Sequence, residues 1–214
     1  MKRRNFVKTA IPAGITAITA GTCKQPYKPD LARKKLFSFV HFTDIHVHPR
    51  PDKHSQGTKE VFFENLPNQK LETLPIIEVT QVVEKYIQKL KPNRIFTQHG
   101  GDINRDHQVV FEATMTATRP IVNQVVQEVY TYNTPSSTEW NFYEGEKVFI
   151  PNVYENIEMS INKKLEAMSI YKSECREYPH PRSLQSLKVH ANYWGVTVGF
   201  EYAEPFKLMR KIGV

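Results

Sequence analysis

The sequence predicts an α/β protein with a mostly parallel sheet flanked by helices. Short apolar runs rich in β-branched and aromatic residues alternate with longer segments in which apolar residues recur every three or four positions. This alternation is typical of strands that are joined by helices in a parallel sheet. The 214 residues, 40% of them hydrophobic and 24% charged, are enough for one globular domain with its own core.

The first 35 residues are expected to be an export leader followed by a polar linker. Arg3 and Arg4 precede a weakly apolar run at 10–21, which is too short and too polar to cross a bilayer as a helix. This arrangement resembles a bacterial twin-arginine (Tat) export signal. We therefore expect an exported protein, in the periplasm or cell envelope, with no membrane span after removal of the signal. A basic, disordered N-terminus is the alternative.

The net charge of +7 comes from this leader. It holds 9 of the 29 Lys and Arg residues and one of the 22 acidic residues, so the rest of the chain is close to neutral. No basic stripe with interleaved aromatic residues follows, and we expect no nucleic-acid partner. With only Cys23 and Cys175, the chain has neither a disulfide framework nor a cysteine-based metal cluster.

The elements after the leader follow from hydrophobic spacing and from the turn residues between them. The clearest helix covers 72–90, because Val79, Val83 and Ile87 fall on one helical face and a Lys-Pro-Asn sequence comes next. The full order is a strand at 36–42, a loop at 49–58, a short strand and turn at 60–67, a helix at 72–90, a strand at 94–98, a helix at 106–120, a strand at 128–133, and helices at 157–174, 182–195 and 203–212.

The sequence GGDINRDH, residues 100–107, lies between a predicted strand and a predicted helix, at the sheet edge where α/β proteins bind ligands. His107, at the start of the helix, is suited to bind zinc, and the adjacent Asp106 is suited to fix its tautomer. Asp102 and Asn104 are expected to cap the helix or to line the pocket. His99 is a further candidate. A plain turn with a helix cap is the alternative.

Several motifs in order resemble the PIG-L/LmbE family of zinc-dependent de-N-acetylases. They are HGGDINRDHQVV, PSSTEWNF, YPHPRS and GVTVGFEYAEPF, and the resemblance covers residues 57–214. It implies a Rossmann-like fold, a Zn²⁺ cofactor and hydrolysis of an N-acetyl group on an amino-sugar conjugate, such as a conjugate of GlcNAc. The conjugate is the expected partner.

The resemblance also implies roles for single residues. His107 would be the third zinc ligand, and Asp106 would act in catalysis by orienting His107 or another histidine of the pocket. Arg119, Asn104 and His99 are expected to contact the substrate. The SSTEW and PHPRS sequences are expected to build the site or its rim, although Trp140, His180 and Arg182 within them are equally suited to packing or surface ion pairs.

One family motif is missing. The family opens with His-Pro-Asp-Asp-Glu, which supplies two zinc ligands and the general base, but here the sequence HFTDIHVHP stands in its place. That sequence resembles the opening of exported calcineurin-like metallophosphoesterases, in which Asp-x-His binds a metal. The expected organisation is thus a signal and linker at 1–35, a metallophosphoesterase-like segment at 36–56 and a deacetylase-like domain at 57–214.

Two explanations of this junction remain open. The deacetylase has either lost its first strands and kept a damaged site, or Asp44, His46 or His41 face His107 and rebuild a zinc site. His41 and Asp44 have the three-residue offset of the family's two ligands, and in that alignment Thr43 occupies the position of the catalytic carboxylate. This predicts weak zinc binding and slow amide hydrolysis.

Two other functions compete with the deacetylase. A metallophosphoesterase would use Asp44, His46 and Asp102 with manganese or iron, but the chain has neither Gly-Asn-His-Asp/Glu nor Gly-His-x-His. A sugar-binding or inert remnant of the fold is the alternative without catalysis.

Overall fold

The computed structural model describes residues 64–141 and 145–213, except for the side chain of Glu146, together with four strands nearer the N-terminus. These strands are β1 (Arg4–Asn5), β2 (Val7–Ile11), β3 (Phe39–Thr43) and β4 (Glu60–Phe62). Strand β2 lies within the segment expected to be an export leader, where the sequence analysis predicts no strand. It pairs with β3 and β4 in an antiparallel arrangement.

The main sheet has seven strands in the order β4-β2-β3-β6-β7-β9-β8. Its other members are β6 (Arg94–Gln98), β7 (Glu128–Tyr132), β8 (Val153–Asn156) and β9 (Ala203–Lys211). The predicted α/β class is confirmed, but the strands run parallel only at the centre, where β3, β6 and β7 meet. The outer strands are antiparallel to their neighbours, so the sheet is mixed. A separate two-stranded sheet joins β1 to β5 (Asn65–Leu66).

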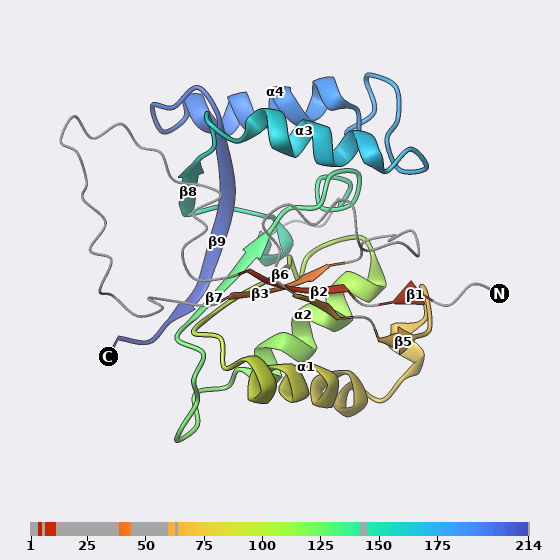
Figure 1. Ribbon diagram of the computed structural model, residues 1–214, viewed down its shortest axis with the longest axis vertical. Helices are drawn as coiled ribbons and strands as arrows, with labels where there is room; N and C mark the ends of the chain where they lie inside the picture. The colour runs from red at the N-terminus through yellow and green to blue at the C-terminus, as the bar shows by residue number, and fades with distance from the viewer. Residues whose placement is uncertain are drawn as a thin grey trace.

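Helices α1 (Ile76–Leu90) and α2 (Arg105–Ala117) lie together against one face of the central strands (Figure 1). Helix α1 begins directly after Pro75 and ends at Leu90. Lys91 is its C-cap: it has a φ of 45°, and its N–H donates to the carbonyl of Ile87. A short 3₁₀ turn, η1 (Leu71–Thr73), precedes it. The main core of buried residues forms here: Leu71, Val79, Val83, Ile87, Ile95, Val109, Val110, Ala113, Ala117, Val126 and Val129.

Helices α3 (Ile161–Ile170) and α4 (Leu184–Val196) form a second layer at the other end of the molecule, beside β8 and β9 (Figure 1). Their own core is small: Ile157, Ile161 and Ala191 are buried, and Leu165 and Tyr202 pack against them. The long strand β9 is the element that connects the two layers, because it pairs with β7 on one side and with β8 on the other. A second 3₁₀ turn, η2 (Gly145–Lys147), lies in the connection between β7 and β8.

The prediction of a helix at 203–212 is wrong, because these residues form β9. The strand is stabilised by pairing along both sides and by the ring of Phe206, whose centroid lies 5.1 Å from that of Phe96 and 6.4 Å from that of Tyr130. Neither contact is visible in the local sequence. Strand β8 was also not predicted, and the predicted helix at 157–174 is shorter than expected, from Ile161 to Ile170.

Within the described part of the chain, no helix is both long enough and apolar enough to span a lipid bilayer.

Candidate functional site

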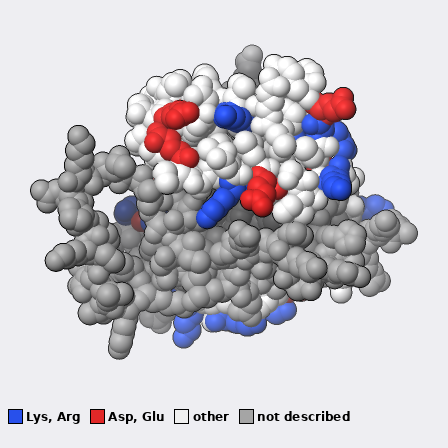
Figure 2. Space-filling view, turned by 45° about the horizontal axis from the view of Figure 1, so that its top comes forward, with Lys and Arg blue, Asp and Glu red and all other residues white. Residues whose placement is uncertain are grey.

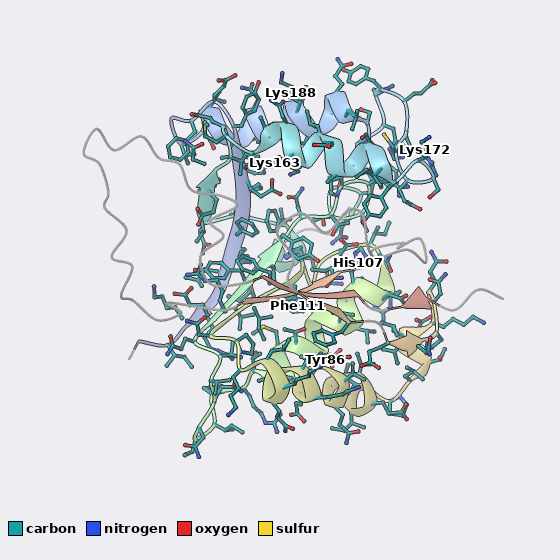
Figure 3. All side chains as sticks on the ribbon, viewed as in Figure 1. Tyr86, His107, Phe111, Lys163, Lys172 and Lys188 are labelled. Atoms are coloured by element: carbon teal, nitrogen blue, oxygen red, sulfur yellow. The ribbon has the colours of Figure 1, made fainter. Side chains whose placement is uncertain are left out.

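The turn between β6 and α2 positions the candidate site at the carboxyl edge of the central strands. Asn104 is the N-cap of α2, and its side-chain oxygen accepts a hydrogen bond of 3.0 Å from the N–H of Asp106. Gly101 packs so tightly that a Cβ there would lie 2.0 Å from the carbonyl oxygen of Lys147, so only glycine fits. As a result His107 lies in the first turn of α2, on the side toward α3 and α4 (Figure 3).

Asp102 is the hydrogen-bonding centre of the site, and its side chain is 0% exposed. Its Oδ1 accepts from the Ser137 hydroxyl and from the N–H of Asn104 at 2.8 Å, and its Oδ2 accepts from the Thr138 hydroxyl at 2.8 Å. The Nδ1 atom of His107 lies 3.1 Å from Oδ2. Burial acts to raise the pKa of Asp102, but the contact with His107 and the other donors outweighs it and lowers the pKa. The carboxylate is therefore ionised inside the protein.

The Asp102 contact determines how His107 presents its second nitrogen. A carboxylate beside Nδ1 favours the tautomer in which Nδ1 carries the proton and Nε2 keeps its lone pair. Nε2 lies 3.3 Å from Nδ2 of Asn104, and both residues line the pocket. A histidine held in this way by a buried carboxylate is the usual arrangement of a zinc-binding imidazole.

A pocket of about 550 Å³ opens in front of His107. One wall is formed by Asn104 and His107 of α2 with residues 134–137, which follow β7. The other wall comes from α3, α4 and their connection, and its residues are Met168, Tyr171, Glu174, Arg176, Arg182 and Leu187. The pocket therefore lies between the two helical layers, at the edge of the sheet where the fold class predicts a ligand site.

Asp106 contacts a different part of the structure from the one that we predicted. Its two carboxylate oxygens accept hydrogen bonds from the N–H groups of Gln69, at 2.7 Å, and Leu71, at 3.1 Å. It thereby attaches the segment before α1 to the first turn of α2, while Asp102 is the carboxylate beside His107. The catalytic role of Asp106 stays a prediction.

Of the three predicted substrate contacts, only Asn104 lines the pocket. Arg119 lies beyond the far end of α2, where its half-exposed guanidinium bonds to the carbonyl of Thr116 at 2.9 Å and to Glu84 at 3.3 Å. His99 is buried and does not line the pocket, and its Nε2 lies 2.9 Å from the carbonyl oxygen of Lys147. Burial lowers the pKa of His99 and so favours its neutral form.

Of the three predicted zinc ligands, the structure describes only His107. Asp44 and His46 lie outside the described residues, as does the side chain of His41. In the described ranges, no three His, Cys, Asp or Glu side chains come close enough together to hold a metal ion. His107 fits a zinc ligand by its contact with Asp102.

The SSTEW and PHPRS sequences do meet at the site. Ser137 and Arg182 line the pocket, and the ring centroids of Trp140 and His180 are 5.6 Å apart at a nearly perpendicular angle. The sequence alone does not indicate that the hydroxyl groups of Ser137 and Thr138 bind Asp102. The only signal was their place in a motif, because the contact joins residues that are 35 and 36 positions apart.

Residues 50–118 match the family model of the GlcNAc-PI de-N-acetylases, PIG-L. The match includes the whole GGDINRDH motif. It begins at residue 50, so it overlaps the last seven residues of the segment expected at 36–56 and leaves residues 36–49 outside. The resemblance of the 36–56 segment to metallophosphoesterases stays a prediction. A search of curated protein sequences gives no match.

Two solved structures share the fold. A conserved protein of Thermus thermophilus superimposes with a TM-score of 0.53 at 19% identity, covering 70% of this chain and 66% of that one. The N,N'-diacetylchitobiose deacetylase of Pyrococcus horikoshii, solved with an inhibitor, gives 0.51 at 17% identity, covering 68% and 55%. This chain thus spans between about half and two thirds of their lengths. Residues 50–118 are thus similar to the PIG-L family model, and they lie in a mixed α/β fold that both solved structures share.

Proposed function

We propose that this chain is a zinc-dependent de-N-acetylase, which hydrolyses the N-acetyl group of an amino-sugar conjugate. The observation that carries the proposal is the buried contact between Asp102 and His107 at the edge of the pocket. Both residues lie inside the segment that matches the PIG-L model. The family match supports the deacetylase chemistry, and the tautomer favoured at His107 supports the metal.

The proposed zinc ligands are His107, Asp44 and His46. His107 offers Nε2, because Asp102 holds its Nδ1. Asp44 follows β3, and β3 runs parallel to β6, so β3 ends at the same edge of the sheet as the turn that precedes α2. This direction supports placing the Asp44 and His46 side chains among the ligands. When bound, zinc lowers the pKa of a water molecule and polarises a carbonyl group.

The described residues have supporting roles in this reaction. Asp102 keeps the Nδ1 proton of His107 in place, and its own charge is stabilised by Ser137 and Thr138. Asn104 lines the pocket beside the imidazole and offers its amide group to the acetamido group of the substrate. Asp106 acts as a positioning residue, since it holds the backbone of Gln69, another residue of the pocket wall.

The reaction is proposed to be slow. When His41 and Asp44 are aligned with the two zinc ligands of the family's opening motif, Thr43 stands where that motif supplies a carboxylate, which takes the proton from the attacking water. A hydroxyl group is a far weaker base at neutral pH, and the loss of a general base typically reduces the rate about 10² to 10⁴-fold. The turnover of a simple GlcNAc conjugate is expected to lie below that of a complete site by about this factor.

Metal content and acetate release test the proposal together. The purified chain should hold close to one zinc ion by elemental analysis and should release acetate from a methyl glycoside of GlcNAc. The His107→Ala variant should lose both the zinc and the acetate release. His190→Ala is the matched control, because His190 lies on α4 outside the pocket lining.

Three outcomes would contradict the proposal. A folded chain that binds no zinc and releases no acetate, but still binds a GlcNAc glycoside, would be a non-catalytic remnant. Release of phosphate from a simple phosphodiester with manganese or iron would instead favour the metallophosphoesterase. Unchanged zinc and acetate release in His107→Ala would place the active site elsewhere.

We also propose that the protein is exported through its twin-arginine leader. Replacement of Arg3 and Arg4 by lysine should retain the protein in the cytoplasm of a bacterial host, as fractionation would measure. Export of the double variant at the normal level would refute this proposal.

A further inference from the structure

Two arginines line the wall of the pocket that faces His107. Arg176 and Arg182 belong to the connection between α3 and α4, and the N–H of Arg176 donates to the carbonyl oxygen of Arg182 at 3.5 Å. This backbone contact keeps the two residues next to each other on one wall. In Figure 2, Lys and Arg side chains gather on the right of the described surface, the side on which Figure 3 labels Lys172 of the same connection.

Arg182 is paired, but part of its hydrogen-bonding capacity is unused. Its Nη1 forms an ion pair with Glu174, and its side chain is 28% exposed. Its Nε is buried and, among the described residues, has no hydrogen-bond acceptor. A buried donor without an acceptor costs free energy unless a ligand or water supplies one. The pocket is the place from which a ligand can supply it.

Arg176 has a charge that no described carboxylate neutralises. Its Nη1 donates to the backbone carbonyl of Ser173 and, at 3.4 Å, to that of Cys175. These two bonds orient the guanidinium group but leave its positive charge uncompensated. Among the described residues, Glu174 is the one acid that lines the pocket, and it forms the ion pair with Arg182.

The opposite wall adds to the positive potential. Asn104 and His107 lie at the N-terminal end of α2, where the helix dipole is positive. Apolar atoms of Met168 and Tyr171 line the space beside the arginines. The pocket thus combines a candidate reaction centre, an apolar surface and an excess of cationic groups on the facing wall.

We infer that the substrate carries an anionic group, a carboxylate or a phosphate, beside its acetylated sugar, and that Arg176 binds this group. Arg182 assists through its unused Nε donor. Guanidinium groups suit both anions, because their planar arrangement of N–H donors matches two oxygens at once. This inference rests on the proposed function for the position of the acetyl group, but the anion subsite stands on the arginines alone.

Binding and turnover of three probes test the subsite. The probes are a methyl glycoside of GlcNAc, which is neutral, N-acetylmuramic acid, which carries a carboxylate, and GlcNAc 6-phosphate. In buffer of low ionic strength, at least one anionic probe should bind to the full chain about tenfold more tightly than the neutral probe. Added salt should reduce the difference, because Arg176 is exposed and its charge is screened. The preferred probe distinguishes the carboxylate from the phosphate.

Two variants test whether Arg176 causes the difference in affinity between the anionic and the neutral probes. Arg176→Gln should reduce the difference in affinity to about twofold or less. Lys172→Gln removes the same charge from the same connection but outside the pocket lining, and the difference should persist in it. The inference is overturned if all three probes bind equally to the unmodified chain, or if the preference survives in Arg176→Gln.

The same experiment separates this inference from the proposed function. Binding of an anionic probe that depends on Arg176, without acetate release from any probe, would support the subsite and contradict the deacetylase. Acetate release from the neutral and anionic probes with equal kcat/KM would support the deacetylase and overturn the subsite.

Discussion

The two helical layers are built differently, although both contribute a wall to the same pocket. Eleven buried residues form the core around α1 and α2, whereas three buried residues form that between α3 and α4 in the described ranges. Helix α4 also exposes apolar side chains, with Val189, Tyr193 and Val196 at 54, 58 and 63%. His107, Asp102 and Asn104 belong to the layer around α1 and α2, which is the firmly packed layer. The arginines proposed for specificity lie on the other layer, where we expect substitutions to be better tolerated because fewer residues are buried.

Asp102→Asn is expected to have the largest effect on the firmly packed layer. The amide keeps the shape but loses the charge on which four donors depend, and truncation of a buried hydrogen-bonded charge typically costs about 3–5 kcal/mol. The free energy of unfolding, from urea denaturation, should fall by that order. Zinc affinity should fall about 10- to 100-fold, as for other partners of a metal-binding histidine. Glu166→Gln on the exposed surface of α3 is the control and should change neither quantity.

A matched pair of isoleucines compares the two layers directly. Ile95 is 0% exposed in the main core, and Ile161 is 4% exposed between α3 and α4. Ile95→Ala should cost about 3–5 kcal/mol of stability, because its closely packed neighbours cannot fill the cavity. Ile161→Ala should cost about 2 kcal/mol, because its smaller core can partly collapse. Equal costs in urea denaturation would remove the distinction between the layers.

The pH dependence of stability sharpens the comparison further. The folded state lowers the pKa of Asp102 below its ordinary value of 3.8. Its contribution to stability is therefore complete above pH 3.8 and is lost as the pH falls through the lower pKa of the folded state. As the pH falls below 3.8, the melting temperature of the unmodified chain should drop more steeply than that of Asp102→Asn. Parallel curves for the two proteins would contradict an ionised Asp102.

Asn104→Ala should have the smallest effect on stability. It removes the hydrogen bond to the N–H of Asp106 at the start of α2, and the loss of such a cap costs about 1 kcal/mol. Acetate release should decrease more than stability suggests, because the same amide lies 3.3 Å from Nε2 of His107. Asn104→Asp keeps the cap and should restore stability without restoring the amide donor.

The firmly packed layer is also the part that the sequence predicts best. Helix α1, strand β6, helix α2 and strand β7 follow from local spacing, since each has one consistently apolar face or a short apolar run. The prediction of a helix at 203–212 was wrong because β9 depends on two partner strands that lie far away in the sequence. Strands β2 and β8, and the antiparallel direction of the outer strands, were missed for the same reason.

The features of the candidate site also differ in whether the local sequence predicts them. The cap at Asn104 and the position of His107 are local consequences of the β6–α2 turn, and the motif indicated both. The choice between Asp102 and Asp106 as the partner of His107 is not local. It depends on Ser137 and Thr138, which hold Asp102, and on the backbone at 69–71, which occupies Asp106. Arg176 was not identified, because nothing in its neighbourhood in the sequence indicates that it lines the pocket.

Strand β9 determines whether the two layers unfold together or one at a time. Its amide groups bond to β7 along one side and to β8 along the other. The rates of hydrogen–deuterium exchange along this one strand therefore report whether the two layers unfold together. Uniformly slow exchange from Ala203 to Lys211 would mean that the pocket opens only when the whole molecule unfolds. Faster exchange near Ala203, where β9 pairs with β8 alone, would mean that α3 and α4 can detach while the layer that holds His107 remains folded.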